Sequence, residues 1–470
     1  MKRTLLILAI FVLAQPVMPA QQGAVATAPA PAAAVDEIFS KWTTSTPGCA
    51  VGVAVGGKPV LMKAYGMADL EHDVRNTPDT IFEAGSVSKQ FTAMAVQLLA
   101  SEGKLKLDDP VRKYIPELPE YGWPVTIRHM LSHTSGLRDW GSVESIAGWP
   151  RTTREYTHAH VLEIVSRQKS LNFEPGTKWS YSNTGFNLAA IIVSRVSGMS
   201  FADFSKQRIF GPLGLTHTSW RDDHTRIVKG RAIAYSLNGG EYHIEMPFEN
   251  IHGNGGLLTT VGDLLIWNEN FVKPKVGSAK LISEMATGGK FNDGKPLEYY
   301  GLGLFIELYR GLHNVYHSGS TAGYRAHLNR FIDSNTSVAV LCNGSNGDAS
   351  RAANRVSDLY LGDRLKPAAP TPSPAPQPAA MNPPPSAAQL SAVAGSYWSD
   401  EAETMLVAAV DQGALVLRRR PDTVIKLTAI GPDKFRGSIG TITFIRNASG
   451  AVDALSVNQD RVWDLRFTKK

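Results

Sequence analysis

Short apolar runs and helical patterns alternate along most of the chain. Near the start, residues 49–55 and 60–65 are apolar runs on either side of a Gly-Gly pair, which predicts two strands joined by a tight turn. The apolar spacing then changes to three and four residues, which predicts a helix that begins near Ser86 and ends before Gly103. The apolar positions of this helix are Phe91, Met94, Ala95, Leu98 and Leu99.

The rest of this region continues with helices and then returns to strands. Helical patterns cover residues 126–133, 158–168 and 184–197. Strand patterns cover residues 303–308, 324–333 and 337–343. Strands at both ends with helices between them predict an α+β fold, or α/β sandwich, in which an antiparallel sheet with flanking helices lies beside a helical subdomain. We expect a cleft between the two parts.

A change in composition divides the chain. Residues 366–390 are rich in Pro and Ala, so they cannot bury a core and are expected to form an extended linker. This linker separates a body of residues 35–365 from a tail of residues 391–470. Short alternating runs, interrupted by Gly and Asp, predict that the tail is a small all-β domain, a barrel or sandwich.

The first residues have the pattern of a secretory signal peptide. Two basic residues precede an apolar core at 4–14, and small residues follow, so we predict a signal peptide over residues 1–20 and a flexible leader over residues 21–34. The alternative is an uncleaved anchor, but the apolar core is well short of the roughly 20 residues that a spanning helix needs. We expect a periplasmic or secreted protein with no stable membrane insertion after cleavage.

Composition excludes several classes of protein. Of the 470 residues, 43% are hydrophobic and 19% are charged, which excludes wholesale disorder and a multi-span membrane protein. The 48 basic and 42 acidic residues give a net charge of +6. The longest basic run, residues 418–420, is too short for a nucleic-acid footprint, so no nucleic-acid partner is expected. Two cysteines exclude a disulfide scaffold and a Cys-built zinc site.

Ser86 and Lys89 form the sharpest candidate for chemistry. At positions i and i+3 of a helix they share a face, so the amine can approach the hydroxyl. Ser86 would lie in the first turn, where free N–H groups favour developing negative charge. A lysine that is desolvated in a cleft can lose its proton and act as a base, or stay charged and lower the pKa of the serine.

The same spacing also arises by chance, and the chain contains two further examples. Ser101 and Lys104 flank the glycine that ends the helix, and Ser166 and Lys169 lie at the polar end of another helical pattern. Only Ser86 follows a strand and a loop and opens a strongly apolar helix. Ser86 is therefore the preferred candidate.

Two further motifs strengthen this candidate. The Tyr-Ser-Asn motif at 181–183 follows a turn-rich segment, and its tyrosine can relay a proton while its asparagine amide can grip a peptide bond. The alternative is an ordinary helix start with Asn183 as the cap. The His-Ser-Gly-Ser motif at 317–320 precedes a strand, and Gly319 would let a ligand backbone approach closely. The alternative here is a simple hairpin turn.

Together, the three motifs in this order are much more specific than any one alone, and they resemble the penicillin-recognising serine hydrolases. The closer similarity is to the class C β-lactamase branch, with its DD-peptidases, D-aminopeptidases and related esterases. It covers roughly residues 35–360, and the tail resembles the small lipocalin-like extension that follows many such domains. Further similar phrases are TIRHMLSHTSGL at 126–137, FEPGTKWSYSNTGFNLAA at 173–190, GNGGLLTTVGDLLIW at 253–267 and YGLGL at 300–304.

The resemblance implies a role for each residue of the site. Ser86 would be the acylated nucleophile, Lys89 its partner and Tyr181 the proton shuttle. Asn183 would contact the substrate amide. The backbone N–H groups of Ser86 and Ser320 would form an oxyanion hole. The substrate-binding wall on the far side would be lined by His317, Ser318 and Gly319.

His317 departs from the class C β-lactamases, which carry the lysine of Lys-Thr-Gly at this place. His-Ser-Gly is more like the DD-peptidase and D-aminopeptidase members. An unperturbed histidine is only about a quarter protonated at pH 7, so attraction for a β-lactam or peptide carboxylate should be weaker. Two interpretations stay open: a cationic His317 holds a substrate carboxylate, or a neutral His317 orients Ser318 or Tyr181 by hydrogen bonding.

The remaining motifs do not indicate another chemistry. There is no Gly-x-Ser-x-Gly elbow and no Gly-rich phosphate loop. His129 and His133 have the spacing of a metal pair but lack an obvious third ligand, so both are interpreted as structural and no metal or cofactor is expected.

Cys49 and Cys342 lie on strands that are neighbours in the resembled fold. Because cross-strand disulfide geometry is demanding, two buried free thiols are favoured over a bond.

The sequence thus predicts an exported serine hydrolase that acts on peptide, amide or ester substrates through a Ser86 acyl-enzyme. Its partner would be a small-molecule or peptide substrate, with peptidoglycan-derived compounds and β-lactams included. The alternatives are a β-lactam-hydrolysing enzyme or esterase and, from another class, a penicillin-binding-like receptor or sensor with little turnover. The sequence does not determine the oligomeric state.

Overall fold

The structure is a computed structural model that describes residues 32–151, 153–368 and 379–470. The predicted signal peptide and most of the predicted leader lie outside the described residues. Helix α1 (Ala32–Phe39) begins at Ala32, so the segment predicted as leader overlaps the start of this helix.

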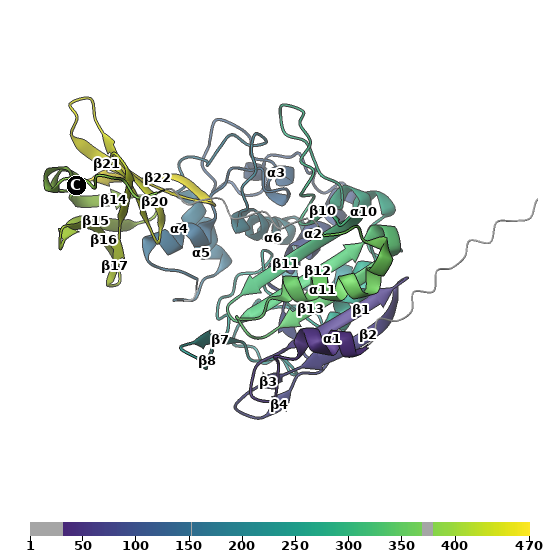
Figure 1. Cartoon of the computed structure of the whole chain (residues 1–470). Helices are drawn as coiled ribbons and strands as arrows, with labels where there is room; N and C mark the ends of the chain where they lie inside the picture. Colours follow the sequence, from purple (N-terminus) through teal and green to yellow (C-terminus); the bar gives the residue numbers. More distant parts are fainter. Residues whose placement is uncertain (1–31, 152, 369–378) are drawn as a thin grey trace, which may run out of the picture.

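A six-stranded antiparallel sheet forms the centre of the body (Figure 1). Its strand order is β10-β11-β12-β13-β1-β2. The bounds are β1 Cys49–Val55, β2 Lys58–Tyr65, β10 Phe305–Tyr309, β11 Leu312–Thr321, β12 Tyr324–Phe331 and β13 Thr336–Cys342. The first and last strands of the body, β1 and β13, are antiparallel neighbours. This pairing joins the two ends of the body in one antiparallel sheet.

Helices cover both faces of this sheet, so the predicted α+β architecture is confirmed. α1 and α11 (Ala349–Leu361) pack on one face, where Phe39 and Val356 meet Val51 and Val340 in a buried cluster. α9 (Val261–Glu269) contacts β1 and β13 from the other face.

The other helices of the body are η1 Gly85–Ser88, α2 Lys89–Ser101, η2 Val111–Lys113, α3 Ile127–Leu131, α4 Trp140–Ala147, α5 His158–Ser166, α6 Asn183–Ser197, α7 Phe201–Ser205, η3 Lys206–Phe210, α8 Gly211–Leu213, α10 Ala279–Met285, η4 Ile332–Ser334 and η5 Gly362–Arg364. The short strands of the body are β3 Met67–Asp69, β4 Val74–Arg75, β5 Phe82–Glu83, β6 Ser219–Trp220, β7 Tyr235–Asn238, β8 Glu241–Ile244 and β9 Leu257–Thr259.

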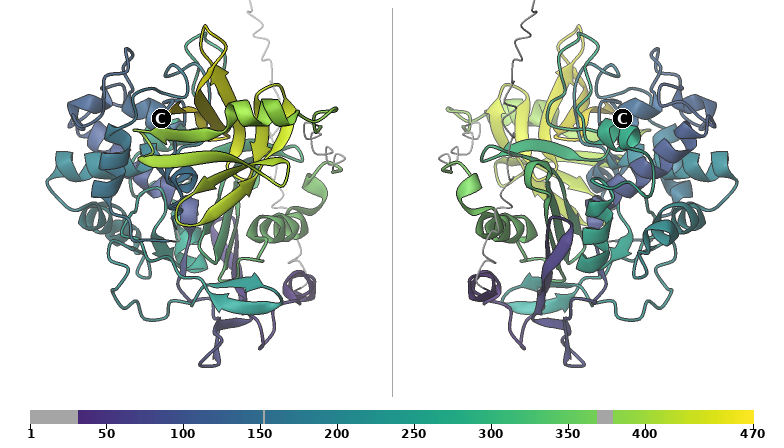
Figure 2. Two further views of the ribbon diagram at one scale, coloured as in Figure 1. Left: turned by 90° about the vertical axis from the view of Figure 1, so that its left-hand side faces the viewer. Right: turned by 90° about the vertical axis from the view of Figure 1, so that its right-hand side faces the viewer.

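The tail forms a nearly closed antiparallel barrel of nine strands (Figure 2). It lies beside α4 and α5 of the body (Figure 1). Its strand order is β17-β16-β15-β14-β22-β21-β20-β19-β18. The bounds are β14 Gly395–Ser399, β15 Thr404–Asp411, β16 Ala414–Arg419, β17 Thr423–Lys426, β18 Thr428–Gly431, β19 Lys434–Gly437, β20 Gly440–Arg446, β21 Val452–Gln459 and β22 Val462–Lys469. Helix α12 (Ala387–Val393) places Leu390 and Val393 in the barrel core. The segment predicted as an extended linker up to residue 390 is therefore helical from Ala387.

Helix α4 of the body packs directly into the barrel. Ile146 and Ala147 lie in the same buried cluster as the barrel core. The last carbonyl groups of a helix have no intrahelical donor, and here the tail supplies the donors. Thr404 Oγ1 and Arg420 Nε each donate to the Ala147 oxygen at 3.1 Å, and Arg419 donates to the Ile146 oxygen at 2.8 Å. The basic run of the sequence thus caps a helix of the body.

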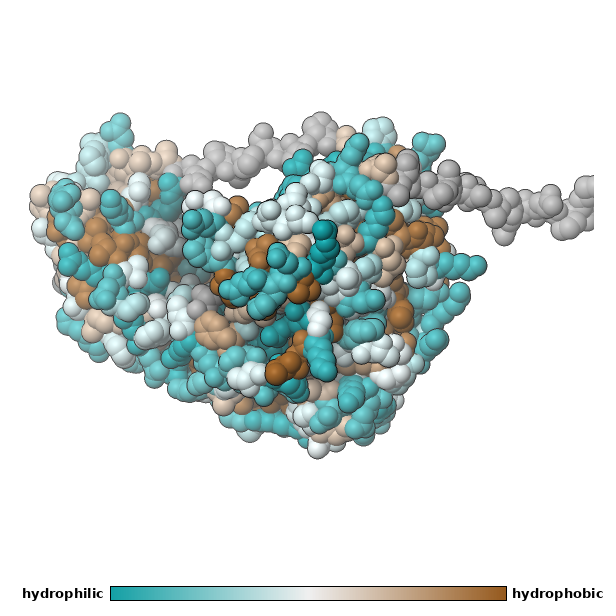
Figure 3. Space-filling view, turned by 90° about the horizontal axis from the view of Figure 1, so that it is seen from below, coloured by the Kyte–Doolittle hydropathy of each residue, from teal (hydrophilic) through white to brown (hydrophobic). Residues whose placement is uncertain are grey.

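The surface in Figure 3 is mainly hydrophilic, with hydrophobic residues in small separate groups. No single helix in the described part of the chain has both the length and the hydropathy to cross a bilayer. Both criteria are met only by α6 taken together with the helical segment Phe201–Leu213, and this pair is bent by 82°.

Cys49 and Cys342 form a disulfide, so the prediction of two free thiols is wrong. The two residues stand directly opposite each other in the β1–β13 register, and their Cα atoms are 4.0 Å apart. Strand pairing brings together two cysteines that are separated by 293 positions, and the sequence spacing alone gave no measure of that approach.

Loss of this disulfide should destabilise the protein. Replacing both cysteines by alanine should lower the free energy of unfolding by about 2–5 kcal/mol, because the bond closes a very long loop in the unfolded chain. Urea unfolding of the double variant and the native protein measures the difference. As a control, thiol titration of the denatured, unreduced native protein should detect no free thiol. Two reactive thiols in that titration would contradict the bond.

Removal of the barrel should expose the apolar side of α4. We expect a chain that ends at residue 365 to bind a hydrophobic dye and to aggregate at a lower temperature than the full chain. The same truncated chain with Val143→Ser and Ile146→Ser is the matched control and should recover solubility. A truncated chain that is as soluble and dye-free as the full chain would mean that the barrel is only tethered to the body.

Candidate active site

Ser86 lies in a turn that touches the sheet backbone to backbone. η1 precedes α2, so the helix that was predicted to begin near Ser86 begins just after this turn. Gly85 has a φ of +51°, and a Cβ atom there would lie 2.6 Å from the Ser320 backbone nitrogen. A Cβ atom on Gly319 would lie 2.0 Å from the Ala84 carbonyl oxygen. Gly319 was predicted to admit a ligand backbone, and in the structure it admits the backbone of η1.

The backbone N–H groups of Ser86 and Ser320 both lie at the contact between η1 and β11. The N–H of Ser86 is in the first turn of η1, where a helix offers no acceptor. Thr321 and Tyr324 close a two-residue hairpin, so they are expected to form a hydrogen-bonded pair. Hydrogen-bonded and non-hydrogen-bonded pairs alternate along antiparallel strands, so the next pair, Ser320 and Arg325, is a non-hydrogen-bonded one. The Ser320 N–H therefore points away from β12, toward η1. This arrangement fits the predicted oxyanion hole.

The amine of Lys89 is buried and touches three oxygen atoms. Its Nζ lies 3.1 Å from Ser86 Oγ, 2.9 Å from Asn183 Oδ1 and 2.8 Å from the backbone oxygen of Asn254. The amide and backbone oxygens can only accept hydrogen bonds. A neutral amine donates its two hydrogens to them, and its lone pair is then directed at the Ser86 hydroxyl.

The electrostatic surroundings of Lys89 favour this neutral form. Burial lowers the pKa of Lys89 well below its usual value, because a charged amine loses its hydration there. The positive charges of Arg461 and Arg151 lower the pKa further, while Asp139 opposes them. Of the two states considered for this lysine, the structure favours the base.

Tyr181 and Asn183 reach the same point from the start of α6. Asn183 is the first residue of the helix, and its side chain accepts from Lys89, so it does not act as the cap. Its Nδ2 has no hydrogen-bond acceptor among the described residues. Burial raises the pKa of Tyr181 well above its usual value, and a hydrogen bond with the Ser86 side chain acts in the opposite direction. Tyr181 is therefore a neutral phenol beside the nucleophile.

His317 is buried and neutral, which decides between the two interpretations of this residue. Its Nδ1 lies 2.6 Å from the Ser318 backbone oxygen, so Nδ1 carries the hydrogen. The bare Nε2 then accepts from the Tyr300 hydroxyl at 3.2 Å. Burial lowers the pKa of His317 to about 3, because a charged imidazole would lose its hydration there. His317 orients β11 and does not supply a cation.

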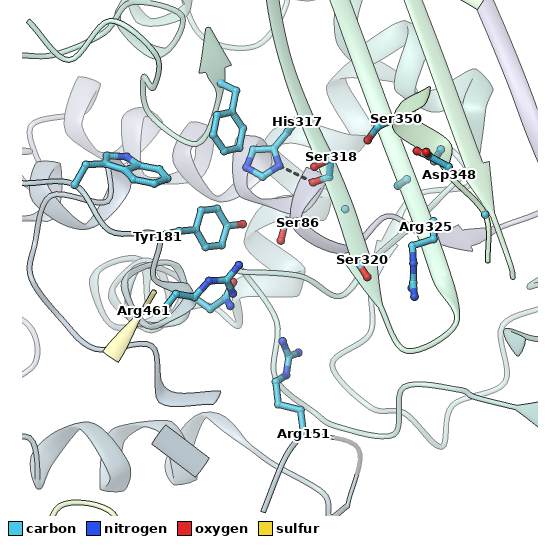
Figure 4. A pocket seen from close by; sticks show the side chains of 17 residues that line it. Ser86, Arg151, Tyr181, His317, Ser318, Ser320, Arg325, Asp348, Ser350 and Arg461 are labelled. Carbon is cyan, nitrogen blue, oxygen red and sulfur yellow. Dashed lines mark hydrogen bonds between the residues drawn. The ribbon is translucent and has the colours of Figure 1, made fainter. Parts of the chain in front are cut away.

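A cavity of about 690 Å³ opens in front of these residues (Figure 4). The predicted site residues that line it are Ser86, Tyr181, Asn183, His317, Ser318, Gly319 and Ser320. Lys89 lies behind them and is fully buried. The structure thus brings together all the residues that the sequence predicted for the site.

Several residues of the site were not found from the sequence. Arg151 and Arg461 line the cavity, and Arg461 comes from the tail. Asn254 supplies a backbone oxygen, which leaves no signal in its side chain. Asp139 caps α4 and accepts from the Asn183 N–H at 2.7 Å. Of these residues, only Asn254 had a signal in the sequence, because it lies in the glycine-rich segment quoted above for the family resemblance.

His129 and His133 have separate structural roles, as the sequence predicted. His129 Nδ1 accepts from the Thr126 N–H at 3.3 Å at the start of α3. His133 Nδ1 accepts from the Ser182 N–H at 3.2 Å, and its ring packs against Tyr181 at a centroid distance of 4.2 Å.

The fold and the geometry of the site define the class of penicillin-recognising serine hydrolases, and comparison with known proteins agrees. The family model described as Beta-lactamase matches residues 32–362. The chain therefore belongs to the β-lactamase family, and the resemblance found in the sequence is confirmed.

Two curated relatives and one solved structure illustrate this membership. Penicillin-binding protein 4* of Bacillus subtilis is 30% identical over 306 residues, which are 62% of this chain and 66% of that protein. A D-aminopeptidase of Brucella ovis is 29% identical over 67% of this chain and 60% of its own length. The chain thus spans less than two thirds of these relatives. The octameric penicillin-binding protein homologue from Pyrococcus abyssi has a TM-score of 0.62 at 25% identity and covers 93% of this chain and 99% of its own.

The lowered pKa of His317 predicts a specific pH dependence of stability. Below about pH 6.5 an unfolded histidine takes up a proton, whereas His317 stays neutral down to about pH 3 in the folded protein. Stability should therefore fall as the pH decreases through this window. His317→Gln should reduce the slope of unfolding free energy against pH, by at most about 1.4 kcal/mol per pH unit.

Urea unfolding at a series of pH values between 4 and 6.5 measures this slope. His243→Gln, on the exposed side of β8, is the control substitution and should leave the slope unchanged. If His317→Gln has the same slope as the native protein, then His317 titrates in the folded state and the neutral assignment is wrong.

Proposed function

We propose that this protein is an exported serine hydrolase that cleaves peptide, amide or ester bonds through an acyl-enzyme on Ser86. One observation carries the proposal. The buried amine of Lys89 lies 3.1 Å from Ser86 Oγ, and its two other contacts are oxygens that accept both of its hydrogens. A base that faces the nucleophile is thus held in its neutral, proton-accepting form.

Acylation follows from this geometry. The proton of Ser86 Oγ passes to Lys89 Nζ while Oγ forms a bond to the substrate carbonyl carbon. The carbonyl oxygen becomes negative between the N–H groups of Ser86 and Ser320, an interaction worth about 3–4 kcal/mol per donor in comparable acyl transfers. The C–N or C–O bond then breaks, and the proton passes through the Tyr181 hydroxyl to the leaving group. Water hydrolyses the resulting ester and restores Ser86.

Three further observations support peptide-like substrates and export. The free Nδ2 of Asn183 lines the cavity as a hydrogen-bond donor for a substrate carbonyl. The relatives include a protein named as a D-aminopeptidase and one named as penicillin-binding, which supports amide and peptide bonds as targets. The Cys49–Cys342 disulfide supports an oxidising compartment, in agreement with the signal-peptide pattern.

Substitution of the nucleophile or its base should abolish turnover. Ser86→Ala and Lys89→Ala should each reduce kcat/KM by roughly 10³-fold or more, and the double variant should lose little more, because the two residues act as a unit. A p-nitrophenyl ester, a D-alanine p-nitroanilide and a fluorescent penicillin with and without a chase form the substrate panel. A penicillin adduct that survives the chase would favour the receptor alternative.

The chain offers two matched controls for this test. Ser101 and Ser166 each precede a lysine by three residues, but their hydroxyls donate to backbone oxygens within their own helices. Ser101→Ala and Ser166→Ala should therefore keep native activity. Native turnover of every substrate by Ser86→Ala would exclude the proposed nucleophile.

A further inference from the structure

The turn between β21 and β22 of the barrel reaches into the active site of the body. This turn consists of Asp460 and Arg461, between the paired residues Gln459 and Val462. Figure 4 shows the Arg461 side chain next to Tyr181. The guanidinium carbon lies 4.6 Å from the centre of the Tyr181 ring, and Arg461 lines the same cavity as Ser86.

The backbone of this turn is fixed by four hydrogen bonds to the body. The Asp139 N–H and Asn172 Nδ2 donate to the Arg461 carbonyl oxygen at 3.2 and 3.1 Å. Ser180 Oγ donates to the Asp460 oxygen at 3.1 Å, and the Trp463 N–H donates to Asn172 Oδ1 at 2.8 Å. None of these bonds uses the Arg461 side chain, so replacing that side chain removes none of them.

The guanidinium of Arg461 has no hydrogen-bond or ion-pair partner within the described ranges of the chain. The other two arginines of the cavity are engaged: Arg151 pairs with Glu249, and Arg325 donates to backbone oxygens of Ala322 and Tyr324 at 2.7 Å. A guanidinium carries five donors in a planar fork that matches a carboxylate. One cation of the cavity is thus held in place and left without an anion.

We propose that Arg461 is a subsite for a carboxylate on the leaving group of the substrate. This assignment deepens the proposed function. It rests on that function because the roles of Tyr181 and Ser320 decide which part of the substrate faces Arg461. The phenol of Tyr181 is the proton donor to the leaving group, and Arg461 lies against its ring. The N–H of Ser320, which would hold the carbonyl oxygen, lies on the other side of Ser86 (Figure 4).

The substrate class that fits is an acylated amino acid or peptide with a free carboxylate one residue beyond the cleaved bond. In such a molecule the leaving amine and its carboxylate are separated by a single carbon, so both can meet Tyr181 and Arg461 together. An amide or alkylamide leaving group lacks the charge and would leave the guanidinium unpaired. The barrel thereby contributes to specificity, which a tethered domain would not.

Equilibrium binding to a variant without the nucleophile tests this subsite independently of turnover. Isothermal titration of Ser86→Ala with N-acetyl-D-alanyl-D-alanine and with its C-terminal amide compares a free carboxylate with a neutral isostere. We expect the free acid to bind roughly tenfold tighter or better. In Ser86→Ala/Arg461→Gln the two probes should bind within about threefold of each other, with the affinity for the amide unchanged. Arg461→Lys should retain part of the preference.

The matched control is Arg466→Gln, which removes an exposed arginine from β22, the strand that follows Arg461. It should keep the full preference, and thermal unfolding should show that all variants are folded. The proposal is overturned by equal binding of the two probes to Ser86→Ala, by no measurable binding of the free acid, or by a preference that survives Arg461→Gln. Failure of the serine-hydrolase function would be visible separately, as native turnover by Ser86→Ala.

Discussion

The burial of one amine organises the functional half of this protein. Lys89 Nζ is removed from water at the start of α2, and a charge there would be costly unless it were compensated. Two carbonyl-type oxygens, from Asn183 at the start of α6 and from the loop at Asn254, take its hydrogens. The remaining lone pair faces Ser86. Three separate segments must therefore pack correctly before the lysine becomes a base, and the fold of the helical region is what holds them together.

The barrel is bound to the body through α4, and both ends of this helix take part. At its C-terminal end, the free carbonyl groups accept hydrogen bonds from Arg419 and Arg420. At its N-terminal end, Asp139 accepts from the Asn183 N–H and donates its own N–H to the Arg461 oxygen. One residue thus links the start of α6, which carries the site, to the turn of the barrel that enters it. The adjacent Arg138 adds a buried ion pair with Glu401 at 3.1 Å.

Charge in the cavity is distributed differently from what the motifs suggested. The motif at 317–320 drew attention to His317 as a cation, but both of its nitrogens are used inside the protein and burial keeps it neutral. Among the described residues, the arginine of the cavity without a hydrogen-bond or ion-pair partner is Arg461, which lies 144 positions further along the chain, in a different domain. Its field also helps to lower the pKa of Lys89. The same side chain can therefore act on the substrate and on the base.

The sequence by itself predicted strands β1, β2, β10, β12 and β13 and helices α2, α3, α5 and α6 of the body. It also identified Ser86, Lys89, Tyr181 and Asn183 as candidate site residues. These features are local: hydrophobic periodicity is set within a dozen residues, and each motif lies within one short segment. Tertiary structure alone decided the Cys49–Cys342 bond, the neutral state of His317 and the entry of Arg461 into the cavity. Each of these depends on which distant segments pack together. Strand pairing sets the distance between the sulfur atoms of Cys49 and Cys342, and burial sets the pKa of His317. Periodicity within the tail predicts a barrel, but the surface on which that barrel docks is encoded in the complementary shape and hydrogen-bonding groups of α4.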